Sequence, residues 1–290
     1  MTQRRRFRVS LPGGRSLALG ERTLIMGVIN VTPDSFSDGG RLCDAAAAIE
    51  AGQQMEADGA DLIDVGGEST RPGAAPLDDA EEQRRVIPVI EGLAARVRVP
   101  ISVDTYKATT AGAALAAGAA LVNDVSGLRY DPRLAGTIAA RAAAVILMHT
   151  RGRSEEMYAQ ASYHDVVAEV LDELRESMAF ATAAGIPEDR IIVDPGIGFA
   201  KDAVHSYEVL ARLDEFADLA RPVLVGPSRK SFLAKPLGVR VAAPDRDWAT
   251  AAAVAAGVLA GAHIVRVHAV REMTQVVRVA DEIRRYYQHG

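Results

Sequence analysis

Polar side chains follow eight apolar runs of this sequence, at the points where the runs end. In chain order they are Asn30, Asp64, Asp104 with Thr105, Asn123 with Asp124, His149, Asp194, Ser228 to Ser231, and Arg266 with His268. Burying a carboxylate or an amide without a partner costs roughly 1–3 kcal/mol. Stability alone gives little reason for this placement, so the pattern indicates a binding or catalytic site.

Three of these residues, Asp104, Asn123 and Asp194, combine carboxylate acceptors with an amide. Such a set suits a planar, amide-rich heterocycle that presents an edge of hydrogen-bond donors. Two alternatives are open: each side chain caps its own helix or binds a loop amide, or the carboxylates hold a divalent cation. The usual Asp/Glu/His motif of a cation site is absent from the sequence.

The segment Gly226–Ser231 follows the seventh apolar run. If the chain folds as a β/α barrel, this is where such barrels place an anion against a helix N-terminus. Lys230, Ser231 and backbone amides would then bind a carboxylate or a phosphate. A lysine at the end of a barrel strand also suits a Schiff-base aldolase, which is the rival chemistry.

The eighth run ends in two side chains that can donate hydrogen bonds, Arg266 and His268. Arg266 and His268 alternate with Val265 and Val267, so on a strand both point the same way. Asn30 ends the first run, and next to the eighth run it completes a second anion site. The alternative is that Arg266 forms a surface ion pair.

A polar loop follows the first apolar run. Leu24–Ile29 is short and partly β-branched, which suits a strand covered on both faces. Residues 31–40 are rich in turn formers and predict an exposed, mobile loop with Phe36 at its tip. This ring could close over a small molecule, and an ordinary strand-to-helix connection is the alternative.

One pattern repeats along the chain: an apolar run, a polar stop and an alanine-rich amphipathic helix. The runs begin near residues 24, 60, 99, 120, 143, 190, 221 and 263. The helical patterns cover residues 44–58, 78–97, 107–116, 131–141, 163–184, 203–216, 247–261 and 271–287. The pair Asp131-Pro132 predicts a helix start, with Asp131 as the cap and Pro132 at the first helical position.

Eight strand and helix units in alternation favour parallel pairing with right-handed crossovers. The predicted fold is therefore α/β, a (β/α)8 TIM barrel, in one domain over residues 1–290. Residues 7–22 alternate around a Pro-Gly-Gly turn and predict a short N-terminal β-hairpin, so residues 1–22 form an extension. An open doubly wound sheet is the alternative, but no G-x-G-x-x-G motif follows the first strand.

The composition of the chain limits the classes of binding partner and the cellular compartment that we expect. The 290 residues carry a net charge of −5 and a pI near 5.7, which removes a general electrostatic drive toward nucleic acid or an anionic membrane. The single cysteine, Cys43, excludes an internal disulfide and a thiolate metal cluster. No signal-like apolar segment follows Arg4–Arg6 and no stretch is long enough to span a bilayer, so we expect a cytoplasmic protein.

Seven motifs in chain order resemble those of the dihydropteroate synthase family. They are NVTPDSFSDGG (30–40), GGESTRPG (66–73), SVDT (102–105), NDVSG (123–127), DPGIGFAK (194–201), GPSRKS (226–231) and RVH (266–268). The resemblance implies a folate-pathway transferase on a β/α barrel. Such an enzyme joins 6-hydroxymethyl-7,8-dihydropterin diphosphate to p-aminobenzoate and releases pyrophosphate with Mg²⁺ assistance.

The resemblance assigns a pterin pocket to residues of the strand ends. They are Asp104, Asn123, Met148, Asp194, Phe199 and Lys230. Asp194 and Asn123 would grip the amino-pyrimidine edge, and Asp104 would face the other ring. Lys230 would hydrogen-bond the pterin and flank the aminobenzoate, and the remaining two would supply apolar walls.

The resemblance assigns the diphosphate to Asn30, Arg266 and His268, with Asn30 as the protein contact to magnesium. Pyrophosphate loss would leave a cation at the pterin methylene, stabilised by the ring and by nearby Asp104. Asp104, Lys230, Arg266 and His268 are therefore the expected catalytic residues. The aniline nitrogen is a free nucleophile at neutral pH, so positioning should dominate the rate.

The same resemblance assigns the aminobenzoate pocket to two loops and to the segment after the seventh strand. Its residues are Phe36, Thr70, Arg71, Pro72, Lys230 and Ser231. Ser231 and the following helix N-terminus would meet the carboxylate. Loops 31–40 and 66–76 would close to exclude water, which otherwise traps the cation as an alcohol.

The chain departs from the family's usual pattern at Ala269, where Asp usually follows Arg-Val-His. Loss of a helix cap there would cost about 1 kcal/mol, and loss of an acid that orients His268 would weaken diphosphate binding. Two alternatives stay open: a methyltetrahydrofolate-dependent methyltransferase on a similar barrel, and a non-catalytic pterin-binding paralogue. A homodimer is the family expectation, although no apolar stripe in the sequence identifies its face.

Overall fold

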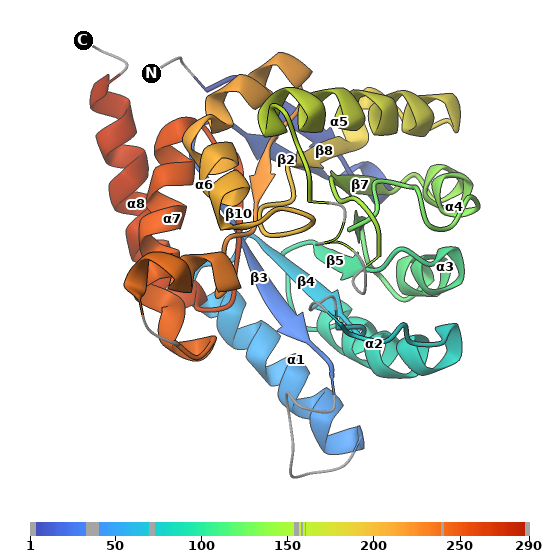
Figure 1. The fold of residues 1–290 in the computed structure, drawn as a ribbon. Coiled ribbons are helices and arrows are strands. Elements are labelled where there is room, and N and C mark those ends of the chain that lie inside the picture. Colours follow the sequence, from blue (N-terminus) through green and yellow to red (C-terminus); the bar gives the residue numbers. More distant parts are fainter. Residues whose placement is uncertain are drawn as a thin grey trace.

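The structure is a computed structural model that describes residues 4–32, 41–69, 73–153, 157, 159, 161–238 and 241–287. Its main sheet contains β3 (Leu24–Asn30), β4 (Leu62–Gly66), β5 (Ile101–Asp104), β6 (Leu121–Asp124), β7 (Ala144–Met148), β8 (Ile191–Asp194), β9 (Leu224–Val225) and β10 (Ile264–Val267). The strands are parallel in the order β8-β7-β6-β5-β4-β3-β10-β9. A parallel bridge between Val193 and Val223 joins the two edges, so the sheet closes into the predicted barrel (Figure 1).

Helices surround the barrel strands (Figure 1). They are α1 (Arg41–Ala57), α2 (Asp79–Ala94), α3 (Ala108–Ala116), α4 (Leu134–Ala140), α5 (Val166–Ala183), α6 (Ala203–Ala211), α7 (Asp247–Ala260) and α8 (Val270–Tyr287). The short 3-10 helices are η1 (Pro12–Gly14), η2 (Glu188–Arg190), η3 (Leu213–Leu219), η4 (Ser231–Leu237) and η5 (Pro244–Arg246). Because helices cover the outer face and side chains fill the inside, the strands are apolar on both faces. Within the described parts of the chain, no helix has the length and apolar character needed to cross a bilayer.

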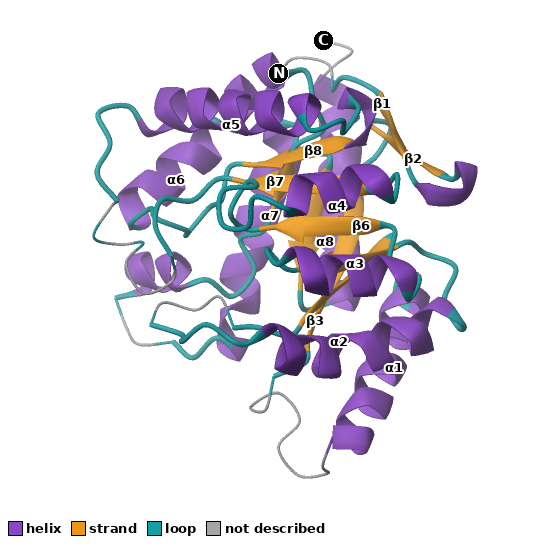
Figure 2. Ribbon diagram, turned by 90° about the vertical axis from the view of Figure 1, so that its right-hand side faces the viewer, coloured by secondary structure: helices purple, strands orange, loops and turns teal. Residues whose placement is uncertain are grey.

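The predicted hairpin is present and closes one end of the barrel. β1 (Phe7–Ser10) pairs antiparallel with β2 (Ser16–Leu19). Figure 2 shows it at the right, opposite the long loops at the carboxyl ends of the strands. Its buried apolar residues pack with those that fill the inside of the barrel: Val9, Leu11, Leu17, Leu19, Leu24, Met26, Leu62, Leu121, Ile146, Ile192, Leu224 and Ile264. Each fully buried aliphatic side chain contributes about 1.5–3 kcal/mol, so this floor stabilises the end of the barrel that carries no predicted site.

The predicted helix start at Asp131 is wrong. α4 begins at Leu134, after a turn. The Asp131 carboxylate instead accepts hydrogen bonds from the backbone N–H of Ala108, the first residue of α3, at 2.9 Å and of Arg133 at 3.0 Å. The cap therefore serves the preceding helix, which the local sequence does not reveal because Ala108 is distant in the chain.

A buried histidine ties the floor to the N-terminal segment. His263 Nδ1 accepts the Val223 N–H at 3.1 Å, and its Nε2 lies 2.9 Å from the Arg5 carbonyl. These contacts fit a neutral ring with its proton on Nε2, and burial lowers the pKa of His263 to about 4.

Acid should therefore weaken the fold through His263. Below its unfolded pKa near 6.5 the unfolded chain binds more protons, so the free energy of unfolding falls by up to about 1.4 kcal/mol per pH unit between about pH 6.5 and 4. Urea unfolding of the parent and of His263→Asn at pH 7.5, 6 and 5 measures this loss. The variant should start less stable at pH 7.5 and show a shallower pH slope; equal slopes would contradict the assignment.

Candidate active site

Four polar side chains meet inside the carboxyl end of the barrel. Arg266 Nε lies 2.7 Å from Asp64 Oδ2, and Arg266 Nη2 lies 2.8 Å from Asp104 Oδ2. Asn123 Nδ2 donates to Asp64 Oδ2 at 2.9 Å. The guanidinium thus reaches from β10 across β3 to β4 and β5. The surface ion pair considered for Arg266 is wrong, since the side chain points inward to two carboxylates.

Burial sets the charge of the Asp104 carboxyl. Desolvation raises its pKa to about 7, Arg266 opposes this change, and the negative charge of Asp64 adds to it. The group therefore changes protonation near neutral pH, where it can either accept or donate a hydrogen bond.

Asp194 at the end of β8 and Lys230 after the neighbouring β9 lie close enough to interact electrostatically. Burial raises the pKa of Asp194, and the nearby Lys230 charge opposes that shift. Burial likewise lowers the pKa of Lys230 to about 8, while Asp194 opposes it. One Asp194 oxygen, Oδ1, accepts the Gly196 N–H at 2.7 Å. An acidic acceptor and a cationic donor thus stand at one side of the mouth.

Two apolar residues line the same region as the sequence predicts. Met148 is buried at the end of β7, beside Asp194 in the sheet register. The Phe199 ring follows β8, and Lys230 Nζ lies 4.4 Å from its centre. Lys230 also donates to the carbonyl of Ile197. A planar ligand would therefore find aromatic, thioether and charged contacts close together.

Asn30, His268 and Ser228 form a second group at the ends of β3, β10 and β9. Asn30 Nδ2 lies 3.4 Å from His268 Nε2, and Ser228 Oγ lies 2.9 Å from His268 Nδ1. The Ser228 hydroxyl also accepts the His268 N–H at 3.2 Å. The imidazole is therefore oriented from both ring nitrogens without an acid at Ala269, the position that directly precedes α8.

The loop after β4 is held at its base. Glu68 accepts the Leu77 N–H at 3.2 Å, the Tyr106 hydroxyl at 2.8 Å and the Lys107 ammonium at 2.6 Å. Lys107 also donates to the Leu77 carbonyl at 2.5 Å. The two ends of the loop are thereby joined. The predicted site residues Thr70, Arg71, Pro72 and, from the first loop, Phe36 lie outside the described residues, so their contacts stay predictions.

Ser231 is exposed and begins η4, which has seven residues. The helix N-terminus predicted after the seventh strand is thus a short 3-10 helix with Lys230 at its cap position. The role of Ser231 toward a carboxylate stays a prediction.

The sequence reasoning missed two features of the mouth. Asp64 is a polar strand end to which no motif assigns a role, yet it is the residue that holds both Arg266 and Asn123. A cavity beside Phe199 is lined by Tyr106, Tyr130 and Arg153, among others. These residues lie on three separate loops, and no spacing in the sequence links them.

Comparisons with known proteins agree with this geometry. The pterin binding enzyme family matches residues 26–268. A dihydropteroate synthase of Bacillus subtilis is 42% identical over 266 residues, which cover 92% of this chain and 90% of the relative. This chain belongs to the dihydropteroate synthase family.

Solved structures of the dihydropteroate synthase family have the same fold. The Xanthomonas albilineans protein with 4-aminobenzoic acid is 40% identical, with a TM-score of 0.88 over 96% of this chain and 98% of that chain. A second structure from this organism, in complex with 7,8-dihydropteroate, is 38% identical, with a TM-score of 0.84 over 95% and 98%. The family resemblance and the barrel fold expected from the sequence are confirmed.

The charge of Asp64 should be detectable at Asp104. In Asp64→Asn the neighbouring negative charge is gone, so the pKa of Asp104 should fall below its parent value of about 7. Carbon NMR of labelled aspartate carboxyls measures this pKa directly. Asp172→Asn removes an exposed carboxylate on α5 that pairs with Arg175 and should leave the titration unchanged. An unchanged or raised pKa in Asp64→Asn would contradict the coupling.

Proposed function

We propose that this chain joins 6-hydroxymethyl-7,8-dihydropterin diphosphate to p-aminobenzoate, giving 7,8-dihydropteroate and pyrophosphate. The observation that carries the proposal is the hydrogen-bonded group of buried Asp64 and Asn123 with partly buried Asp104 and Arg266, beside Asp194. Acidic acceptors and an amide on one side of a desolvated mouth suit the donor edge of a pterin. The names of the relatives and the ligands of the Xanthomonas albilineans structures support the same reaction.

Asp194 and Asn123 bind the amino-pyrimidine edge in this proposal, and Asp104 faces the other ring. The Asp64 carboxylate fixes the Asn123 amide through its Nδ2, which directs the amide before the substrate arrives. Met148 and Phe199 pack on the ring. Because these groups are held by other protein groups, little reorganisation accompanies binding.

Catalysis begins with cleavage of the bond between the pterin methylene and the diphosphate oxygen, whose electron pair leaves with pyrophosphate. The resulting cation is delocalised into the ring and stabilised by the ionised Asp104 carboxylate. The aminobenzoate nitrogen then donates its lone pair to the methylene carbon and loses a proton to the released pyrophosphate. Lys230, above the Phe199 ring, lies beside the pterin ring and the aminobenzoate ring in this proposal and holds the two substrates in line.

Arg266, His268 and Asn30 hold the diphosphate in this proposal. Among the residues described, no cluster of three or more His, Cys, Asp or Glu could hold a metal ion. The Asn30 amide oxygen is a hard ligand, and its nitrogen lies toward His268, so the donor set fits magnesium held mainly by diphosphate oxygens and water. When bound, Mg²⁺ would neutralise charge on the leaving group.

Ser231 would meet the aminobenzoate carboxylate, and Phe36, Thr70, Arg71 and Pro72 would complete that pocket from their loops. The joined base formed by Glu68, Leu77 and Lys107 would hold the second loop at its two ends. Closure of both loops would exclude water from the cation. For the compartment we propose the cytoplasm, since a chain with one cysteine makes no internal disulfide.

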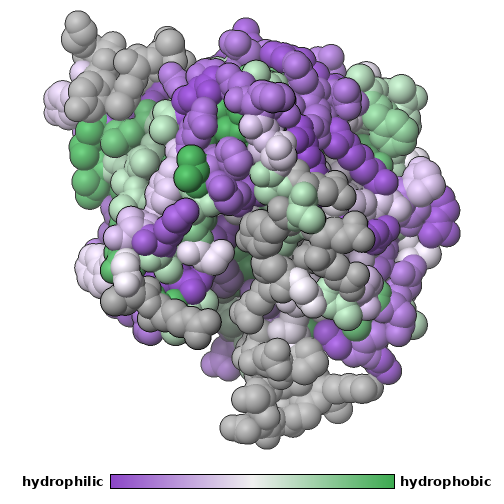
Figure 3. Space-filling view, in the orientation of Figure 1, coloured by the Kyte–Doolittle hydropathy of each residue, from purple (hydrophilic) through white to green (hydrophobic). Residues whose placement is uncertain are grey.

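We also propose that a second copy of this chain covers α8. Val279, Ile283 and Tyr286 are 62%, 44% and 75% exposed, and their spacing puts them on one helix face. Figure 3 shows hydrophobic surface at the left edge, over α8. Arg278 and Glu282 border one side of the stripe with opposite charges, and a two-fold interface can bring Arg278 of one copy near Glu282 of the other, which pairs with its own Arg285 at 3.0 Å.

The assay for the proposed function is p-aminobenzoate-dependent release of pyrophosphate, measured with and without magnesium. Release should require both substrates and should increase with the metal. A methyltransferase-like barrel or a non-catalytic pterin-binding protein would release none, and that result from folded protein would reject the proposal. Trapping of a carbonyl substrate on Lys230 by borohydride would point to the aldolase instead.

Asp194→Ala should abolish binding of the pterin diphosphate, because the donor edge loses its charged acceptor. We expect affinity to fall at least about 100-fold, or about 2.7 kcal/mol, as measured by calorimetry. Asp218→Ala removes an exposed carboxylate on η3 and should bind as the parent does. Retained micromolar affinity in Asp194→Ala would contradict the pose.

Ile283→Glu should convert the dimer to monomers, because a charge would be buried in the apolar stripe. Sedimentation velocity at micromolar concentration measures the change. Phe180→Glu places the same charge at a 46% exposed apolar site on α5 and should leave the dimer intact. A monomeric parent, or equal behaviour of the two variants, would reject this face.

A further inference from the structure

The turn after β8 has a backbone that needs support. Gly196, Gly198 and Ala200 have φ of 68°, 80° and 47°, a region that non-glycine residues seldom adopt. The turn begins at Asp194 and carries Phe199, two residues placed at the pterin in the proposal above. Whatever fixes this turn also fixes an acceptor and a wall of the pocket.

Lys201 lies beneath this turn and is 1% exposed. Its ammonium donates to the carbonyls of Gly196 at 3.2 Å and Phe199 at 3.1 Å, and to His149 Nδ1 at 2.8 Å. The Gly196 N–H in turn holds Asp194 Oδ1 at 2.7 Å. One buried cation is therefore bonded to Gly196, the residue whose N–H orients the Asp194 carboxylate.

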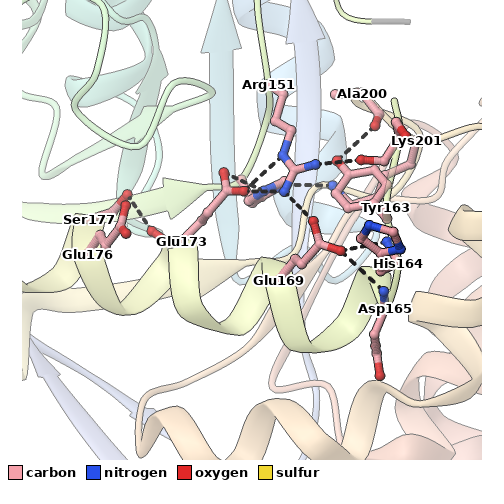
Figure 4. A network of polar contacts seen from close by, with 12 residues as sticks. Arg151, Tyr163, His164, Asp165, Glu169, Glu173, Glu176, Ser177, Ala200 and Lys201 are labelled. Atoms are coloured by element: carbon pink, nitrogen blue, oxygen red, sulfur yellow. Dashed lines mark hydrogen bonds and ion pairs between the residues drawn. The ribbon is translucent and has the colours of Figure 1, made fainter. Parts of the chain in front are cut away.

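A second row of contacts holds Lys201 from the side of α5 (Figure 4). His149 Nε2 lies 3.1 Å from Glu173 Oε2, and Glu173 Oε1 accepts from Arg151 Nε at 2.8 Å. Arg151 lies 4.1 Å from the centre of the Tyr163 ring, and the Tyr163 hydroxyl donates to the Ala200 carbonyl at 2.9 Å. The row starts on an outer helix and returns to the same turn.

The protonation of His149 follows from these contacts. Burial and, after it, the charge of Lys201 lower its pKa to about 3, although Glu173 opposes this shift. The neutral ring accepts the Lys201 proton donor at Nδ1 and donates from Nε2 to Glu173. Burial also lowers the pKa of Lys201 to about 7, and the nearby Asp194 and Glu173 carboxylates oppose this shift.

The turn is held from both sides by lysines. Lys230 donates to the Ile197 carbonyl from the substrate side, while Lys201 binds the carbonyls of Gly196 and Phe199 from beneath. Burying a charge is expensive, and an apolar residue of similar volume often supports a fold equally well. The retained charge at Lys201 therefore needs a reason beyond stability.

We infer that Lys201 is a positioning residue that presets the Asp194 carboxylate and the Phe199 ring for the pterin, with His149 and Glu173 holding its ammonium. The inference rests on the proposed function. It assigns Lys201 no contact with the substrate; the side chain acts through the Gly196 and Phe199 peptides.

Lys201→Met tests the inference, because it keeps the length and volume of the side chain and removes the three hydrogen bonds. The Kd for 6-hydroxymethyl-7,8-dihydropterin diphosphate by calorimetry and the KM for it should rise about tenfold, with kcat within about threefold of the parent. Loss of folded protein alone would lower the binding stoichiometry and kcat and leave Kd and KM unchanged. Lys201→Gln keeps two N–H donors and should recover part of the affinity.

Two variants on α5 give a test that does not depend on the folding of Lys201→Met. Glu173→Ala removes the acceptor of His149 and should raise the pterin Kd about threefold. Glu176→Ala, on the same helix and 75% exposed at its side chain, should leave it unchanged. Folded Lys201→Met with a Kd within twofold of the parent, or equal effects of the two α5 variants, would overturn the inference while the parent stays active. Failure of the parent itself to bind would overturn the proposed function and this inference together.

Discussion

The Arg266 guanidinium, between the buried Asp64 carboxylate and the partly buried Asp104 carboxylate, forms the interaction on which the rest of the site depends. It joins β10 to β4 and β5 across the inside of the barrel and, through Asp64, fixes the Asn123 amide. Removing one partner from such a group leaves an uncompensated buried charge, which costs several kcal/mol. The arrangement persists because closed parallel strands place these side chains at one end, in a fixed register.

One end of the barrel contributes mainly to stability, and the other end carries the candidate active site. The N-terminal end is closed by the hairpin and filled with aliphatic side chains, while polar groups stand at the opposite end. The floor offsets the cost of the buried ionisable groups at the mouth. Raised pKa values of Asp104 and Asp194 and the lowered pKa of Lys230 all have burial as their largest cause. The same desolvation that makes the site expensive makes it selective for a ligand with a matching donor edge.

The barrel and the strand-end residues were predictable because both depend on local pattern. An apolar run that stops at Asn30 or at Asp194 predicts the residue at which a parallel strand ends. Contacts between distant segments were not predictable. Asp131 caps α3 rather than its own helix, and Lys201 meets His149 across 52 positions. Residue spacing in the sequence predicts neither contact. The role of Asp64 is not predictable for the same reason, since its partner Arg266 lies 202 positions away.

A crystal structure of this chain with the pterin diphosphate would test the central claim most directly. We predict that the pterin lies inside the carboxyl end of the barrel, with its amino-pyrimidine edge on Asp194 and Asn123 and its diphosphate toward His268. A pterin bound outside the barrel mouth, or reversed so that its donor edge lies away from Asp194 and Asn123, would contradict that claim.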